Sequence, residues 1–140
     1  SEAIATYLAV MSKLKTPIIV IITGEGGSGG ALAIGVGDHI AILEHATYSV
    51  ASPEACASII WRTAEKASDA AEAMKVSAQE LIKIKIVDEI IKEPLGGAHR
   101  DYKEISESVR SCILKNLGIL LSKPVDKLLE ARYKKLLEIG

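Results

Sequence analysis

Residues 24–30 read Gly-Glu-Gly-Gly-Ser-Gly-Gly and lie between two apolar stretches. The stretch before them, residues 17–23, is rich in β-branched side chains and predicts a strand that is buried on both faces. Residues 29–37 predict a short helix of small side chains that ends at glycines. A strand that leads through glycines into a helix N-terminus presents unpaired backbone N–H groups, which bind anions. The stretch therefore predicts a turn that binds an anion or an oxyanion.

The chemistry that this turn supports best is stabilisation of an oxyanion in a transition state. We expect the backbone N–H groups near Gly29 and Gly30 to donate to an oxygen that gains negative charge. A side chain at either position would obstruct the approach, and loss of one such donor costs about 10² to 10³ in rate. The alternative is a purely structural turn, in which the glycines allow close packing between helix and sheet.

Two nucleotide-binding motifs compete for the same glycines. Residues 24–29 fit the dinucleotide pattern GxGxxG, and Glu44 follows at about the 20-residue distance expected for a ribose-binding carboxylate. However, the predicted strands 39–43 and 47–51 are separated by only Glu44, His45 and Ala46, which is too short for a crossover helix. A P-loop is excluded because no GK[ST] follows the glycines.

Side chains elsewhere are weaker candidates for a site. Glu25 could orient a substrate, although a glutamate in a turn more often faces solvent or bonds nearby N–H groups. Ser28 has a loose nucleophile-elbow spacing without a triad, and His99 lies beside Arg100 in a second glycine loop that it could simply stabilise. Structural functions are the simpler interpretation for the others: local hydrogen bonding for His39 and His45, helix initiation for Ser52, Pro53 and Glu54 (a corner that could also line a site), and core packing for Cys56.

The elements that position these residues follow from hydrophobic periodicity and capping signals. We expect strands over 17–23, 39–43 and 47–51, and extended chain at 86–87 and 90–91. We expect helices over 1–15, 29–37, 52–61 and 68–75, and a short helix after the capping box that begins at Ser77.

Residues 96–140 are predicted to form a helical tail for subunit association, separate from a core over residues 1–95. One helix is capped by Asp101 and the next starts at Pro124. Their predicted apolar faces are Ile105, Val109, Ile113, Leu117 and Leu120 in the first helix, and Val125, Leu128, Leu129, Tyr133, Leu136 and Leu137 in the second. We interpret Arg132, Lys134 and Lys135 as partners of solvent and of the helix dipole.

Composition narrows the class of protein. The 140 residues are 49% hydrophobic and 25% charged with a net charge of −1, which fits one globular domain and offers no basis for nucleic-acid or membrane binding. Cys56 and Cys112 have no CxxC spacing, which argues against a zinc site or a disulfide scaffold in this chain. We expect a cytoplasmic protein, or one of the plastid stroma. Because helical periodicity begins at once, we also expect the chain to be part of a longer protein.

Four motifs carry a resemblance to a known family: GEGGSGGALAIGVGD, YSVASPEACASIIW, EPLGGAHR and the late Arg-Tyr pair. Together they resemble the carboxyltransferase α subunits of bacterial and plastid-type acetyl-CoA carboxylase, over essentially the whole chain and as their C-terminal portion. The resemblance implies an α/β fold of the crotonase-like (ClpP/crotonase) type. It would be a partial spiral of β-β-α units with a C-terminal helical extension.

The resemblance also implies an activity: transfer of a carboxyl group from carboxybiotin to acetyl-CoA, giving malonyl-CoA for fatty acid biosynthesis. Gly29 and Gly30 would be the catalytic donors on the biotin side, and Gly26, Gly27 and Ser28 are assigned to cofactor binding. Implied partners are a biotin carboxyl carrier protein and a β subunit, in an α2β2 assembly in which the β subunit holds the zinc. This chain would hold no metal and would be inactive alone. A non-catalytic assembly module and a dinucleotide-binding domain stay open as alternatives.

Overall fold

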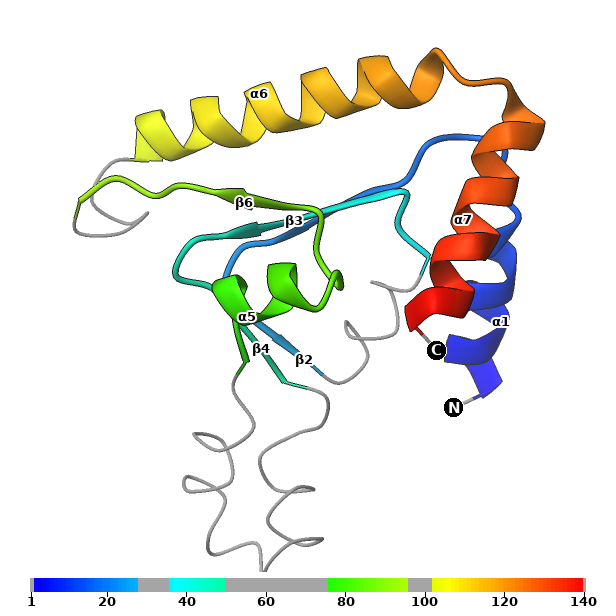
Figure 1. Ribbon diagram of the computed structural model, residues 1–140, viewed down its shortest axis with the longest axis horizontal. Coiled ribbons are helices and arrows are strands. Elements are labelled where there is room, and N and C mark those ends of the chain that lie inside the picture. Colours follow the sequence, from blue (N-terminus) through cyan, green and yellow to red (C-terminus); the bar gives the residue numbers. More distant parts are fainter. Residues whose placement is uncertain (1, 28–35, 50–75, 96–101, 140) are drawn as a thin grey trace, which may run out of the picture.

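The computed structural model describes residues 2–27, 36–49, 76–95 and 102–139. They form two small sheets with helices around them (Figure 1). The helices expected over 29–37, 52–61 and 68–75 fall wholly or largely outside these residues, and Val36 and Gly37, which are described, are not helical. The elements in chain order are α1 (Glu2–Ser12), β1 (Ile19–Ile22), β2 (Glu25–Gly27), β3 (His39–Leu43), β4 (Thr47–Ser49), β5 (Val76–Ser77), α5 (Ala78–Lys83), β6 (Glu89–Ile91), α6 (Tyr102–Leu121) and α7 (Val125–Ile139).

The strands are divided between two sheets of three strands each. Sheet A has the order β1-β3-β6 with all strands parallel, and sheet B has the order β2-β4-β5 with β2 parallel and β5 antiparallel to β4. The chain crosses from sheet A to sheet B twice, from β1 to β2 and from β3 to β4. The short connection Glu44–Ala46 is therefore a corner between sheets, which needs no crossover helix.

The described part of the glycine-rich stretch includes a strand. Glu25–Gly27 forms β2, which pairs with β4 so that Gly26 lies opposite Tyr48 and Gly27 opposite Ser49. The prediction of a continuous turn from Gly24 was wrong here because a neighbouring strand, distant in sequence, pairs with this backbone. β3, β4 and β6 lie where strands or extended chain were predicted, and β1 is shorter than residues 17–23. β5 at Val76–Ser77 was not predicted, because it forms by antiparallel pairing with β4, which is distant in sequence.

The core lies on sheet A and beneath it. Ile40, Ile42, Leu81 and Val87 are almost completely inaccessible to solvent. In Figure 1, α6 lies above sheet A and α5 below it. The prediction for α5 is confirmed, because the Ser77 hydroxyl accepts a hydrogen bond from the Glu80 N–H at 3.2 Å.

The two long C-terminal helices bury only part of their predicted apolar faces, namely Ile105, Leu120 and Leu128, and they also bury polar side chains that were not predicted. The buried side chains of α6 are Ile105, Cys112, Asn116 and Leu120, so the inner face includes a polar amide. Among the α7 residues whose burial the structure describes (125–138), Leu128 and Arg132 are the buried ones, whereas Val125, Tyr133, Leu136 and Leu137 are exposed. Figure 1 shows α7 beside α1, which also contacts it. No helix among the described residues is both long and apolar enough to cross a membrane.

Gly37 is a close-packing position where the chain rejoins sheet A. A Cβ built there would lie 2.9 Å from Val20 Cγ2 and 3.1 Å from Ile40 Cγ1, whereas a Cβ at Gly24 would meet nothing within 4 Å. We expect Gly37→Ala to lower the free energy of unfolding by about 1–3 kcal/mol, because both neighbours are branched and cannot move away freely. Urea denaturation of the full-length protein, with Gly24→Ala as the matched control, measures this. Equal loss in the two variants would contradict the packing argument.

Candidate functional site

The described residues frame the predicted glycine site on both sides. Gly26 and Gly27 belong to β2, while Ser28, Gly29 and Gly30 lie outside the described residues. Of the weaker candidates, Glu25 begins β2 and is exposed. Six other candidate residues from the sequence analysis also lie outside the described residues: Ser52, Pro53, Glu54, Cys56, His99 and Arg100.

Asp38 anchors the chain where it returns from the glycine-rich segment. Its carboxylate Oδ2 accepts a hydrogen bond from the Ile18 N–H at 2.8 Å, and its own N–H donates to the Ile18 carbonyl at 2.8 Å. These bonds fasten the residue before β3 to the residue before β1. The return point of the segment is therefore attached to the edge of sheet A.

Arg132 completes this anchor from α7. Its Nε lies 2.9 Å from Asp38 Oδ1 and its Nη2 lies 2.7 Å from Asp38 Oδ2, so the guanidinium pairs with both carboxylate oxygens. Both side chains are almost fully buried, with 2% and 3% of their area exposed. Such a fork is the geometry in which an arginine and a carboxylate pair most strongly.

The same guanidinium caps the end of α1. Its Nη1 donates to the carbonyls of Met11 and Leu14, and its Nη2 donates to the carbonyl of Thr16, at 2.8–3.1 Å. The last carbonyls of a helix lack partners within the helix. Met11 lies in the last turn of α1, and Leu14 and Thr16 lie just after it, so one arginine from the other end of the chain binds both the helix end and the segment that follows.

The interpretation of Arg132 as a solvent and dipole partner was wrong. Helix geometry offered one signal: Arg132 lies four residues after Leu128, so both side chains share the inner face of α7. The sequence could not show that a carboxylate and several carbonyls meet that face. Lys134 is exposed as expected, whereas Lys135 pairs with Asp88.

Asp88 repeats the arrangement of Asp38 one strand further along. It precedes β6, its Oδ2 accepts from the Ile40 N–H at 2.9 Å, and its N–H donates to the Ile40 carbonyl at 2.8 Å. Lys135, one helical turn from Arg132, reaches this carboxylate. β3 and β6 are thus each preceded by an aspartate, which binds the neighbouring strand or the residue just before it and is paired by a cation from α7.

The corner after β3 is held by glutamates. The Glu93 N–H donates to Glu44 Oε1 at 3.2 Å, and the His45 N–H donates to Glu93 Oε2 at 2.7 Å. Glu44, which the dinucleotide motif would have used for a ribose, therefore bonds a neighbouring loop. His45 is exposed, and its Nε2 lies 3.8 Å from the adjacent Glu44 carboxylate. Its backbone N–H, however, bonds Glu93, so the expectation of local hydrogen bonding is only partly met.

A second polar cluster lies between sheet A and α6. His39 Nε2 is 3.0 Å from Glu89 Oε1, so its partner lies on another strand and the expectation of a local bond was wrong. Glu89 lies opposite Ala41 in the register, and His39 shares a face with Ala41, which brings both side chains to the α6 side. The Asn116 amide donates to the same Glu89 oxygen at 3.2 Å and to the Cys112 carbonyl at 2.8 Å.

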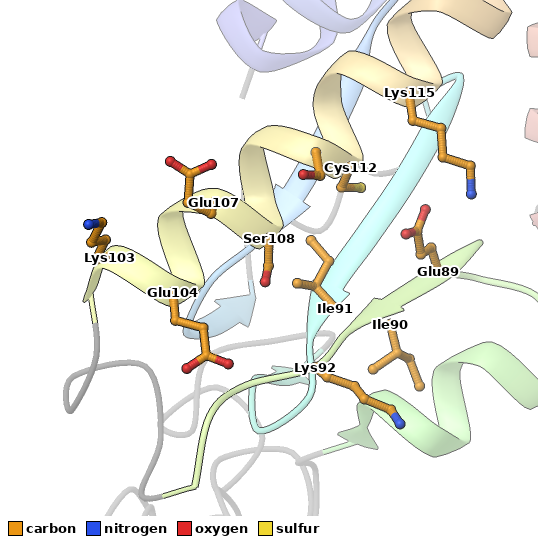
Figure 2. A pocket seen from close by; sticks show the side chains of 11 residues that line it. Glu89, Ile90, Ile91, Lys92, Lys103, Glu104, Glu107, Ser108, Cys112 and Lys115 are labelled. Carbon is orange, nitrogen blue, oxygen red and sulfur yellow. The ribbon is translucent and has the colours of Figure 1, made fainter.

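The pKa values in this cluster shift in opposite senses. Burial alone would raise the pKa of Glu89, but hydrogen bonds from His39, Asn116 and Cys112 outweigh it and leave the pKa below its ordinary value. Burial, and secondarily the Glu89 carboxylate, raises the pKa of the Cys112 thiol. Glu89 and Cys112 both line an open cavity of about 690 Å³ beside α6 (Figure 2).

Comparison with solved structures identifies the fold. The chain superimposes on one chain of a Pseudomonas malonate decarboxylase hetero-tetramer in complex with coenzyme A, with a TM-score of 0.65 and 19% identity, covering 94% of this chain and 52% of that one. It also superimposes on methylmalonyl-CoA decarboxylase in complex with 2-nitronate-propionyl-CoA, with a TM-score of 0.62 and 13% identity, covering 98% of this chain and 52% of that one. A third match is an enoyl-CoA hydratase from Shewanella pealeana, with a TM-score of 0.59 and 14% identity, covering 98% of this chain and 50% of that one. The predicted partial crotonase-like α/β fold is confirmed.

Sequence relatives identify the family. The chain is 56% identical over all 140 residues to the acetyl-coenzyme A carboxylase carboxyl transferase subunit alpha of Alcanivorax borkumensis, and 58% identical to that of Azotobacter vinelandii. It spans 43–44% of the length of these curated relatives. Residues 1–140 also match the family described as acetyl co-enzyme A carboxylase carboxyltransferase-like, and the chain therefore belongs to that family.

Proposed function

We propose that this chain forms part of a carboxyltransferase that moves a carboxyl group from carboxybiotin to acetyl-CoA, giving malonyl-CoA for fatty acid biosynthesis. The observation that carries the proposal is the 56% identity to a carboxyl transferase subunit alpha over the entire chain. The solved structures of similar fold in complex with coenzyme A or an acyl-CoA analogue are consistent with it.

In this proposal the reaction needs donors for negative oxygen rather than an acid–base pair of side chains. Carboxybiotin, held on a biotin carboxyl carrier protein, supplies the carboxyl group. The backbone N–H groups of Gly29 and Gly30 bind the urea oxygen of the biotin, and Gly26, Gly27 and Ser28 line its binding position. Glycine at these positions lets the backbone approach the bound group closely.

The described structure supports this assignment through the two ends of the segment. Before it, β2 is held by the parallel pairing with β4; after it, Asp38 is held by Ile18 and Arg132. Backbone donors stabilise a transition state efficiently only when they are oriented in advance, since reorientation during the reaction would cost free energy. Two fixed ends provide the basis for that orientation.

The proposed partners are a β subunit, which would supply the acetyl-CoA side and the zinc, and the carrier protein, in an α2β2 assembly. Residues 96–140 would form the associating tail. Exposed apolar side chains on its helices support this: Leu121, Tyr133 and Leu137 are each more than 60% exposed. The same observation favours a second candidate function, a non-catalytic assembly module whose helices only hold subunits together.

An assay of the reverse reaction tests the proposal and separates the two candidates. The full-length protein and its β subunit would be incubated with malonyl-CoA and free biotin or biocytin. The rate of acetyl-CoA formation would measure the loss of the carboxyl group from malonyl-CoA. Carboxyltransferase function predicts turnover that requires both subunits and the biotin compound. A stable complex without turnover would identify an assembly module.

A further inference from the structure

Three side chains of different chemistry converge between sheet A and α6. His39 comes from β3, Glu89 from β6 and Cys112 from α6, and one ligand atom of each lies within 4.8 Å of the other two. The group is sheltered: the side chains of His39 and Glu89 are 16% and 32% exposed, and Cys112 is 4% exposed. We propose that His39, Glu89 and Cys112 form a binding site for one divalent transition-metal ion of the Zn²⁺ or Co²⁺ type.

The chemistry of the donor set selects this class of ion. An imidazole, a thiolate and one carboxylate suit Zn²⁺ and similar metals, whereas Mg²⁺ and Ca²⁺ prefer sites made wholly of oxygen ligands. The prediction that this chain contains no metal site rested on the absence of CxxC spacing. It could not detect three ligands brought together from three separate elements.

The distances require only a small adjustment. Bonds of about 2.0–2.3 Å from a tetrahedral Zn²⁺ place its ligand atoms roughly 3.3–3.8 Å apart. His39 Nε2 and Glu89 Oε1 are already 3.0 Å apart, and no pair among the three ligand atoms exceeds 4.8 Å. Movements of about 1 Å, within the range of side-chain rotation, would complete the coordination.

Asn116 is placed to orient two of the three ligands. Its amide nitrogen lies 3.2 Å from Glu89 Oε1 and 3.6 Å from Cys112 Sγ, and its position is fixed by the bond of 2.8 Å to the Cys112 carbonyl. Asn116 is itself buried on α6. Hydrogen bonds of this kind hold the ligands of metal sites in their binding orientation.

Two of the three proposed ligands border a cavity that could admit a fourth ligand. Glu89 and Cys112 line the cavity of about 690 Å³ between β6 and α6, and Figure 2 shows both side chains at its wall with Lys115 nearby. A site with three protein ligands and one position open to such a cavity can accept a water molecule or a small anion as the fourth ligand. The Lys115 ammonium would favour an anion there.

Cobalt binding tests the site directly and independently of the proposed carboxyltransferase function. The full-length protein without its β subunit would be stripped with a chelator and titrated with Co²⁺. We expect one equivalent to bind with a near-ultraviolet thiolate-to-cobalt absorption band, which Cys112→Ser abolishes and Cys56→Ser, the matched control, leaves unchanged.

Further variants distinguish coordination from a hydrogen-bond network of the same residues. We expect Asn116→Ala to weaken Co²⁺ binding by about 10- to 100-fold, and His39→Gln and Glu89→Gln to weaken it by more. The proposal is overturned if no thiolate band forms at one equivalent, if the band survives Cys112→Ser, or if the His39 and Glu89 variants bind like the unaltered protein. Circular dichroism verifies that each variant is folded.

Discussion

Replacing Arg132 with methionine is expected to lower the free energy of unfolding by about 3–5 kcal/mol, the range found when one partner of a buried ion pair is removed. Methionine fills a similar volume but leaves the Asp38 carboxylate, which is 3% exposed, without its counter-charge. It also removes the guanidinium hydrogen bonds to the carbonyls of Met11, Leu14 and Thr16. Equilibrium denaturation of the full-length protein measures the loss.

Two controls isolate the fork from general effects of charge. Lys134→Met removes a cation from the exposed face of the same helix. This variant should change the free energy of unfolding by less than about 0.5 kcal/mol. Arg132→Lys keeps the charge but cannot bond both Asp38 oxygens and the α1 carbonyls together, so most of the loss should remain. If Arg132→Lys were as stable as the unaltered protein, the argument from fork geometry would be wrong.

The Gly30→Val variant is expected to lose carboxyl transfer, by about 10² to 10³ or more in rate, if the proposed function is right. Valine would obstruct the approach of the bound group to the backbone donor. Stability should change far less than activity. The rate is measured in the reconstituted assembly with the β subunit, carrier protein and acetyl-CoA.

A glycine in α6 supplies the control. A Cβ built at Gly118 meets nothing within 4 Å, and the position is exposed, so Gly118→Ala should retain full activity. Normal turnover in Gly30→Val would refute the assignment of this glycine as a catalytic donor. If Gly30→Val lost both turnover and stability, Gly30 would be needed for the fold, and its role as a catalytic donor would not be supported. The denaturation midpoint of the variant measures that stability.

Local sequence patterns were sufficient for the elements whose cause is local. Consecutive β-branched residues predicted β1, the short apolar run of residues 39–43 was predicted as the strand that is β3, and the capping box predicted α5 with Ser77 as its cap. The short interval between β3 and β4 correctly argued against a crossover. This argument needs no side-chain information, because the backbone alone sets the minimum length of a connection between parallel strands of one sheet.

Patterns of apolar residues were less reliable for the faces of α6 and α7. Periodicity counts only apolar side chains, whereas the inner faces of these helices carry Asn116 and Arg132. A polar side chain is buried when partners satisfy its donors, and those partners, Glu89 and Asp38, lie far away in sequence. The same limit hid the meeting of His39, Glu89 and Cys112.

The family, the glycine motif and the positions of β1, β3, β4 and β6 could be inferred from the order of the residues, because motifs and short-range backbone preferences depend on residues that are neighbours in the chain. The strands β2 and β5 could not be inferred in this way. The pairing of β2 with β4, the buried Asp38–Arg132 fork and the convergence on Glu89 could not. Each depends on the register and packing of segments separated by tens of residues or more. Buried charges and polar groups are stable only where such packing brings their partners within bonding distance.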